Sequence, residues 1–235
     1  MNSTFRTNRL MGTGLQTLVG LLLVLSEAHN LRAQSNGVPR YEVYEAALTS
    51  SKNYANPFMD LTVTATFVAP SGRKLMAYAF HDLGSMWRVR IAPDEVGTWS
   101  YSTSCSDASN GGLHHRTGAF ACNASSNNGF VRPDPTRKYW FSFSDGSPFF
   151  ALGDTCTVTS PALSETNRRA YLDARAGKPF NFLRVFASHT FNAWTNQPHP
   201  AVTANPAEFW PWGGTPAAMD YDRLNPQYFQ RFERI

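Results

Sequence analysis

Residues 61–91, LTVTATFVAPSGRKLMAYAFHDLGSMWRVRI, determine how the first half of the chain folds. In the first ten positions threonines alternate with apolar residues, which are Leu61, Val63, Ala65 and Phe67. Alternation with a period of two is typical of a β-strand that buries one face. Pro70 to Gly72 then favour a turn, and KLMAYAFHD follows as a return strand. The stretch therefore predicts antiparallel pairing of successive strands.

The alternation continues beyond this hairpin. In MWRVRI (residues 86–91) the apolar side chains alternate with Arg88 and Arg90, which we expect on an outer, charged face. Short alternating strands separated by turns about every ten residues indicate an antiparallel β-sandwich. We predict this sandwich over residues 34–130.

The N-terminus has the pattern of a secretory signal peptide. Arg6 and Arg9 precede an apolar run, Leu18 to Ser26, which is too short to cross a bilayer comfortably. Small residues allow cleavage after Ala28 or after Ala33. An uncleaved membrane anchor would need about 20 apolar residues, and polar side chains interrupt that length here. We predict a signal peptide over residues 1–33 and a secreted or periplasmic protein with no membrane association after cleavage.

Composition limits the classes of partner. The 235 residues contain 21 basic and 17 acidic side chains, a formal net charge of +4. Residues 1–33 contribute three arginines and one glutamate, which leaves 18 basic and 16 acidic side chains, or +2. A nucleic-acid partner would require a basic block, and none stands out. We therefore expect no nucleic-acid binding.

The predicted export makes the cysteines interpretable. Cys105 and Cys122 lie in two strand-like runs joined by a segment rich in glycine and asparagine. In an oxidising compartment we predict a Cys105–Cys122 disulfide, with two separate buried thiols as the alternative. Such a bridge would stabilise the fold by roughly 3 kcal/mol. No CxxC spacing is present, so the sequence predicts no metal site.

The sequence pattern changes near residue 130. Asp145-Gly146 predicts a hairpin turn, and the apolar run Phe149–Leu152 predicts a strand after it. Ser164 favours the start of a helix that Gly177 and Pro179 would end. FNFLRVF (residues 180–186) then predicts a strand covered on both faces. Strand, helix and strand in this order form a βαβ unit, which indicates an α/β architecture over residues 134–235.

A last helix is predicted from Asn225 and Pro226, with Phe229, Phe232 and Ile235 as its apolar residues. We predict that residues 188–222, between this helix and the βαβ unit, form a loop without regular structure. A (β/α)₈ barrel needs roughly 250 residues, and only about 100 follow the sandwich. We therefore expect an incomplete TIM-type barrel, the N-terminal part of a longer protein.

Two motifs together resemble a known family. WRVRIAPDEVGTW (residues 87–99) and DGSPFFALGDT (residues 145–155) occur in the order found in a family of secreted bacterial proteins. Members carry an immunoglobulin-like N-terminal domain of uncharacterised role before an apiosidase-like (β/α)₈ glycoside hydrolase domain of the cellulase clan. The chain departs from that family where Cys156 and Thr157 stand in place of the more usual Ala-Trp, so we do not expect an aromatic wall of the pocket at this point.

The resemblance implies cleavage of glycosidic bonds in plant or microbial polysaccharide or oligosaccharide, without a cofactor. Two carboxylates would act as acid/base and nucleophile. In such barrels they come from later strands, commonly the fourth and seventh, which this chain does not reach. We assign no catalytic residue within the chain and expect the fragment itself to be inactive.

Four residues are predicted to bind substrate at the carboxyl ends of the barrel strands: Asp154, Arg184, His189 and Trp194. Asp154 would accept hydrogen bonds from a sugar hydroxyl, with a turn-capping role as the alternative. FNFLRV resembles the clan's second strand, which implies that Arg184 pairs with the nucleophile. His189 would bond a hydroxyl unless it is a surface residue, and Trp194 would stack on a sugar unless it packs the loop.

Two other classes of function remain open. The chain would be a non-catalytic carbohydrate-binding or spacer module if the sandwich only holds a glycan or positions a neighbouring domain. It would have neither role if it is a stand-alone truncation. An acidic residue that closes a fourth-strand-like run beyond residue 235 would favour the hydrolase, and a stop codon at position 236 would favour the other two classes.

Overall fold

The computed structural model describes residues 37–156, 165–185, 191–192, 197–198, 210–215 and 218–234. It separates Met1–Ser35 from the unit Asn36–Ile235, and only the second unit is described below. The predicted signal peptide therefore lies outside the described residues. Within those residues no helix is both long and apolar enough to span a membrane.

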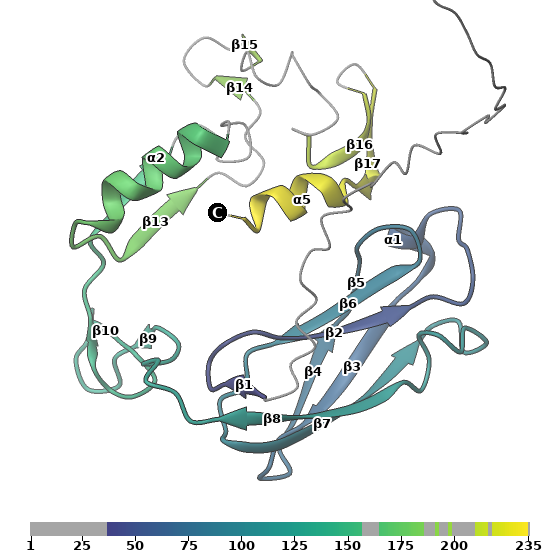
Figure 1. Cartoon of the computed structure of the whole chain (residues 1–235), viewed down its shortest axis with the longest axis horizontal. Helices are drawn as coiled ribbons and strands as arrows, with labels where there is room; N and C mark the ends of the chain where they lie inside the picture. The colour runs from purple at the N-terminus through teal and green to yellow at the C-terminus, as the bar shows by residue number, and fades with distance from the viewer. Residues whose placement is uncertain are drawn as a thin grey trace, which may run out of the picture. The chain divides into compact units, whose positions relative to one another are not determined.

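The first part of the chain forms two β-sheets, hereafter the two-sheet region (residues 37–123; Figure 1). One sheet has the order β1-β8-β7-β3-β4 and the other the order β2-β6-β5. Neighbouring strands are antiparallel except for the parallel pair β1 and β8. The strands are β1 (Val38–Pro39), β2 (Tyr44–Thr49), β3 (Val63–Val68), β4 (Lys74–Tyr78), β5 (Phe80–His81), β6 (Met86–Ile91), β7 (Gly97–Cys105) and β8 (Thr117–Asn123).

Side chains from both sheets form a common core. Phe67 and Trp99 of the first sheet and Val89 of the second are fully buried in one cluster. The ring of Tyr44 stacks on Phe120 of the opposite sheet, with 3.6 Å between ring centroids. The predicted alternation is confirmed in β3 and β6, where alternate side chains are buried in this cluster or in a second one that contains Val63 and Trp87.

The predicted Cys105–Cys122 disulfide is wrong, because both thiols are free and buried. Cys122 lies opposite Gly97, whereas Cys105 is at the other end of the nine-residue strand β7 and pairs with Val63. At about 3.3 Å per residue the two ends are about 26 Å apart, and a disulfide needs Cα atoms within about 7 Å. Residues of a hairpin are neighbours only when they are equally far from its turn, and these two are not.

A small three-stranded sheet follows the two-sheet region. It consists of β9 (Arg132–Pro133), β10 (Phe141–Ser142) and β11 (Pro148–Phe149), in the order β11-β10-β9. The predicted turn at Asp145-Gly146 is confirmed: Gly146 has φ of 86°, a conformation that glycine adopts readily, and connects β10 to β11.

The βαβ unit is present, but its first strand begins later than predicted. β12 (Gly153–Cys156) and β13 (Phe182–Val185) are parallel, and α2 (Glu165–Ala176) connects them. The predicted strand Phe149–Leu152 is wrong over most of its length because the side chain of Asn181 bonds the backbone there, donating to Phe150 O and accepting from Leu152 N. Pairing starts at Gly153, where a Cβ would lie 2.3 Å from Phe182 O, so the strand begins where only glycine fits.

The segment predicted as a loop without regular structure contains strands in its described parts. β14 (Phe191–Asn192) pairs with β15 (Gln197–Pro198), and β16 (Trp212–Thr215) pairs with β17 (Ala218–Leu224). Gly214 has φ of 80° in the second hairpin, and a Cβ there would lie 2.4 Å from Ala218 O. The backbone at Gly214 lies close to that of the paired strand, and glycine contributes no apolar side chain to the sequence pattern. The hairpin therefore lacks the apolar periodicity from which strands were predicted.

The predicted last helix is confirmed as α5 (Pro226–Phe232). The side chain of Asn225 does not cap it but donates from Nδ2 to Trp210 O at 2.9 Å. Tyr228, which the apolar spacing did not select, is fully buried, and Phe229 is half-buried. The helix therefore contacts protein on more than one side, which a single apolar stripe does not describe.

Candidate functional site

The predicted substrate-binding residues begin on the parallel pair β12 and β13. Asp154 is in register with Leu183, and Thr155 is in register with Arg184. Successive side chains of a strand point to opposite faces of the sheet. Asp154 and Arg184 therefore lie on opposite faces of this two-stranded sheet.

The carboxylate of Asp154 faces α2. It accepts hydrogen bonds from Nε of Arg175 at 2.6 Å and from the hydroxyl of Tyr171 at 3.0 Å, and both donors belong to α2. The Arg175 guanidinium lies 3.4 Å from the Tyr171 ring centroid. The hydrogen bonds from Arg175, Tyr171 and the backbone of Thr155 lower the pKa of Asp154, so the carboxylate stays charged near neutral pH.

Arg184 lies on the face that α2 does not cover, and its side chain is exposed. The other two predicted binding residues, His189 and Trp194, lie outside the described residues. The structure thus brings α2 residues to Asp154, but it does not bring Asp154 and Arg184 together.

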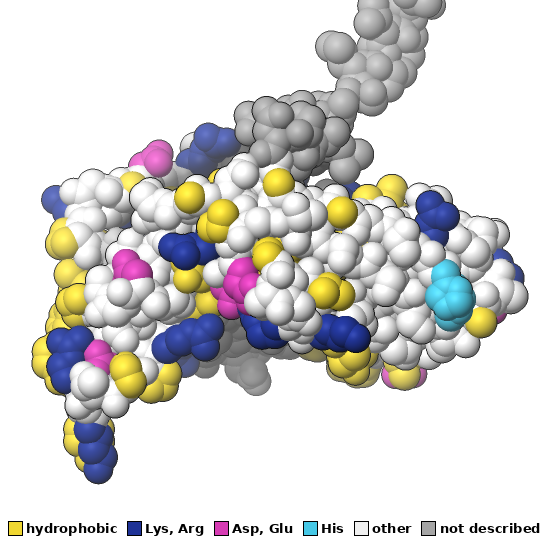
Figure 2. Space-filling model, turned by 90° about the horizontal axis from the view of Figure 1, so that it is seen from below, with side chains coloured by type: hydrophobic (Ala, Val, Ile, Leu, Met, Phe, Trp, Pro, Cys, Tyr) yellow, Lys and Arg dark blue, Asp and Glu magenta, His cyan; other side chains and the backbone are white. Residues whose placement is uncertain are grey.

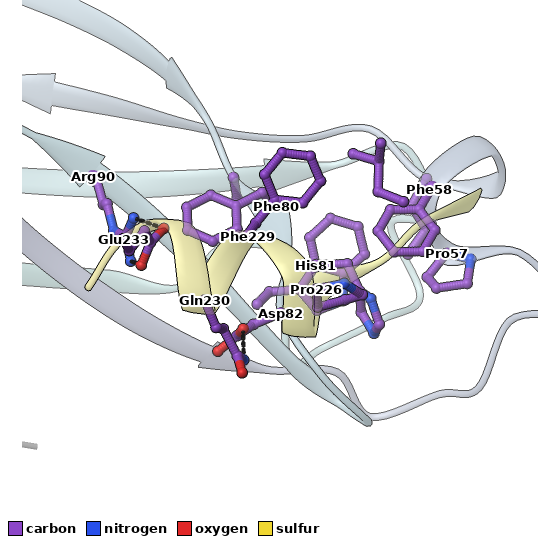
Figure 3. Close-up of a pocket in the computed structure, with 14 residues that line it drawn as sticks. Pro57, Phe58, Phe80, His81, Asp82, Arg90, Pro226, Phe229, Gln230 and Glu233 are labelled. Atoms are coloured by element: carbon purple, nitrogen blue, oxygen red, sulfur yellow. Dashed lines mark hydrogen bonds and ion pairs between the residues drawn. The ribbon is translucent and has the colours of Figure 1, made fainter. Parts of the chain in front are cut away.

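A pocket that the sequence did not predict lies between the two-sheet region and the C-terminal segment (Figure 3). Its volume is about 420 Å³, within the range of small-molecule pockets. Its walls are largely apolar and aromatic: Pro57, Phe58, Leu61, Ala79, Phe80, Trp87, Leu224, Pro226 and Phe229. His81 also lines it, with its ring edge-to-face on Phe58 and its Nε2 2.9 Å from Gly84 O.

Charged groups connect the two sides of this pocket. Arg90 of β6 donates two hydrogen bonds to Glu233, at 2.5 and 3.0 Å, and a third to Glu45 of β2 at 2.5 Å. Nε2 of Gln230 donates to Asp82 at 2.5 Å, and Nε of Arg88 donates to the same carboxylate at 2.6 Å.

These contacts determine the charge states at the pocket. Burial by itself would raise the pKa of Asp82, but the hydrogen bonds from Arg88 and Gln230 outweigh it and lower that pKa. The hydrogen bond to Glu233 is the main cause of a raised pKa of Arg90.

The sequence predicted only part of this arrangement. The alternation in MWRVRI placed Arg88 and Arg90 on the outer face correctly, but it carries no information about Glu233, which is 143 residues away from Arg90.

Comparison with known proteins identifies two segments. Residues 37–106 match the family model of a domain of unknown function, DUF5060, and residues 135–235 match that of the Apiosidase-like, catalytic domain. The crystal structure of a presumed glycoside hydrolase from Bacteroides vulgatus ATCC 8482 is similar, with a TM-score of 0.69 and 24% sequence identity. No curated protein matches the chain.

The similarity covers 84% of this chain but only 38% of the Bacteroides chain. At 24% identity the likeness shows a shared fold. The two family matches follow one another in the order that the sequence motifs indicated. The chain thus matches, in order along the sequence, the family models of DUF5060 and of the apiosidase-like catalytic domain.

Proposed function

We propose that the chain is the N-terminal portion of a secreted glycoside hydrolase that acts on plant or microbial polysaccharide or oligosaccharide. The match of residues 135–235 to an apiosidase-like catalytic domain is the observation that carries this proposal. In it, the two-sheet region is an immunoglobulin-like sandwich. The unit β12–α2–β13 is the first βαβ of a (β/α)₈ barrel.

The geometry of this unit supports a role for Arg184 inside the barrel. In a (β/α)₈ barrel the helices cover the outside of the strands, and the opposite face points to the interior. Asp154 lies on the helix-covered face and Arg184 on the other. A guanidinium on the interior face can pair with a carboxylate that binds the sugar or with the nucleophile, because it offers several hydrogen-bond donors and stays protonated.

The remaining predicted residues divide into two groups. His189 and Trp194 follow β13, and loops at the carboxyl ends of barrel strands form the catalytic face, so both stay proposed as sugar contacts. The carboxylate of Asp154 already accepts hydrogen bonds from α2. We propose that it fixes this helix against β12, in place of the predicted sugar contact.

Hydrolysis needs two carboxylates about 5–5.5 Å apart for retention, or about 6.5–9.5 Å for inversion. Three carboxylates in the described part of the apiosidase-like segment are already in ion pairs: Asp154 with Arg175, Asp220 with Arg223 and Glu233 with Arg90. We propose that sequence beyond residue 235 supplies the catalytic pair. The 38% coverage of the related chain agrees with this proposal.

The surface agrees with a neutral glycan as partner. On the face seen in Figure 2, basic and acidic side chains are interspersed among apolar and uncharged ones. Tight nucleic-acid binding depends on a clustered basic surface. We propose that the partner is a carbohydrate and that no nucleic acid binds.

To test this proposal, the protein is expressed from a reading frame that continues beyond residue 235 and is assayed on aryl glycosides and plant polysaccharides. We expect hydrolysis by the extended protein and a loss of at least about 100-fold in kcat/KM for Arg184→Met, since a group that stabilises charge at the reaction centre contributes on this scale. Binding of polysaccharide without hydrolysis would favour the alternative of a non-catalytic module.

A second experiment tests export. N-terminal sequencing of the secreted protein should give His29 or Gln34 as the first residue, and an intact N-terminus would contradict export by cleavage.

A further inference from the structure

We propose that the DUF5060 domain has an intramolecular function: it provides a docking surface on which β17 and α5 of the apiosidase-like segment are held. The docking surface consists of Asn56, Phe58, Phe80, Asp82 and Arg90. All five lie within residues 37–106, whereas the elements that they contact lie within residues 135–235. The proposal goes beyond glycoside hydrolysis and does not depend on it.

The helix α5 cannot be stable by itself. It has seven residues, and isolated helices shorter than about 12–15 residues are marginal in water. The side chain of Asn225 makes no capping hydrogen bond to the first turn. Tertiary contacts must therefore supply the stability of α5.

Polar contacts to the docking surface lie one turn apart on α5. Gln230 donates to Asp82, and Glu233, which follows the last helical residue, accepts two hydrogen bonds from Arg90. Residues three apart lie on the same face of a helix. One face of α5 is therefore bonded to the docking surface at two points (Figure 3).

The charged groups of the docking surface also bond to neighbours within the two-sheet region. Glu45 accepts hydrogen bonds from both Arg88 and Arg90, and Arg88 also bonds Asp82. Two carboxylates and two guanidinium groups thus balance one another within the two-sheet region. Groups that are already oriented lose little entropy when a partner binds, which favours docking.

Apolar contacts accompany the polar ones. Phe229 and Pro226 of α5 line the same pocket as Phe58 and Phe80. Phe80 is 37% exposed, and the guanidinium of Arg90 lies over its ring at 4.8 Å. The pocket of about 420 Å³ leaves part of this contact unfilled, so the hydrogen bonds carry much of the specificity of docking.

A second pair of bonds holds the strand that precedes α5. Nη2 of Arg223 donates to Ala55 O at 2.6 Å, and Nδ2 of Asn56 donates to Asp222 O at 3.1 Å. Both bonds join β17 to the residues just before α1 (Pro57–Asp60). Docking therefore involves two successive elements of the apiosidase-like segment, as expected of a surface that supports the segment and not of one chance contact.

Amide hydrogen exchange of the 235-residue chain, read by mass spectrometry, tests the proposal. The docking variant combines Gln230→Ala and Glu233→Ala, which leave the two-sheet region unchanged. The matched control is Gln227→Ala, at an exposed position of the same helix. Alanine raises helix propensity at either glutamine position, so a loss of protection in the docking variant cannot come from a lower helix propensity at residue 230. A third variant, Phe80→Ala, alters the docking surface at a partly exposed side chain of β5.

We expect protection of peptides that cover residues 226–232 to fall about tenfold in the docking variant, since a hydrogen bond to a charged group contributes on this scale. Phe80→Ala should lower the same protection, although it lies far from α5 in the sequence. Gln227→Ala should leave protection unchanged, and peptides from β3 and β7 should stay protected throughout. Equal protection of α5 in the docking variant and in Gln227→Ala would overturn the proposal. Because the readout needs no substrate, a failed activity assay would leave this result intact.

Discussion

Replacing Asp82 by asparagine tests the ion pairs at the pocket. The side chain of Asp82 is 11% exposed and that of its partner Arg88 is 20% exposed. Removing one member of a buried ion pair typically costs about 3–5 kcal/mol, because the other charge is left without a partner. Arg88 keeps Glu45 as a second partner, which reduces the loss. We expect the free energy of unfolding to fall by about 2 kcal/mol at pH 7.

The effect of this substitution should depend on pH. Hydrogen bonds from Arg88 and Gln230 outweigh burial and lower the pKa of Asp82 below the ordinary value of 3.8. A lowered pKa in the folded state gives stabilisation that is complete above the unfolded pKa and is lost as pH falls through the folded pKa. The difference between wild type and Asp82→Asn should therefore be largest near neutral pH and shrink below about pH 4.

Urea denaturation at several pH values, monitored by tryptophan fluorescence, measures this difference in stability. The matched control is Asp220→Asn, which breaks an ion pair to Arg223 whose side chains are 42% and 43% exposed. Exposed pairs contribute about 0–1 kcal/mol, so the control should change stability little. A loss for Asp82→Asn that equals the control, or that stays the same at every pH, would refute the reasoning.

Three further predictions concern other parts of the chain. Cys105 and Cys122 should both react with a thiol reagent once the chain is unfolded without reductant, and a linked peptide pair in a non-reducing digest would contradict the strand register. Gly153→Ala should destabilise the β12–β13 pair by about 1–3 kcal/mol, because its Cβ would overlap the backbone of β13; unchanged thermal stability would count against this pairing. Asp154→Asn should lower the urea midpoint at pH 7 only slightly, because both members of its pair with Arg175 are about one third exposed; a loss as large as that of Asp82→Asn would mean that the pair is buried.

Local patterns predicted the strands of the two-sheet region. The alternation around Val63 and Val89 requires only neighbours in sequence, and both side chains are fully buried. The pairing of Cys105 was not predictable in this way, since strand register depends on where β8 starts after its loop. The later start of β12 has a similar cause: the side chain of Asn181, from a distant segment, bonds the backbone that precedes it.

The candidate site was predictable only where a strand pattern placed it. The sequence placed Arg184 in the second parallel strand, and β13 contains it. It did not reveal that Arg175, 21 residues after Asp154, bonds that carboxylate. The docking surface also escaped prediction, because hydrogen bonds between segments more than 140 residues apart leave no periodic signal.

The most direct test of the proposed function is an activity assay of the purified 235-residue chain on aryl glycosides and plant polysaccharides. Hydrolysis requires one carboxylic acid to protonate the leaving oxygen and a second carboxylate at the opposite side of the bond. We predict no turnover by this chain, because the proposed catalytic pair lies in sequence beyond it. Clear turnover that is abolished by changing one carboxylate within residues 134–235 would contradict the proposal and place the catalytic residues inside this chain.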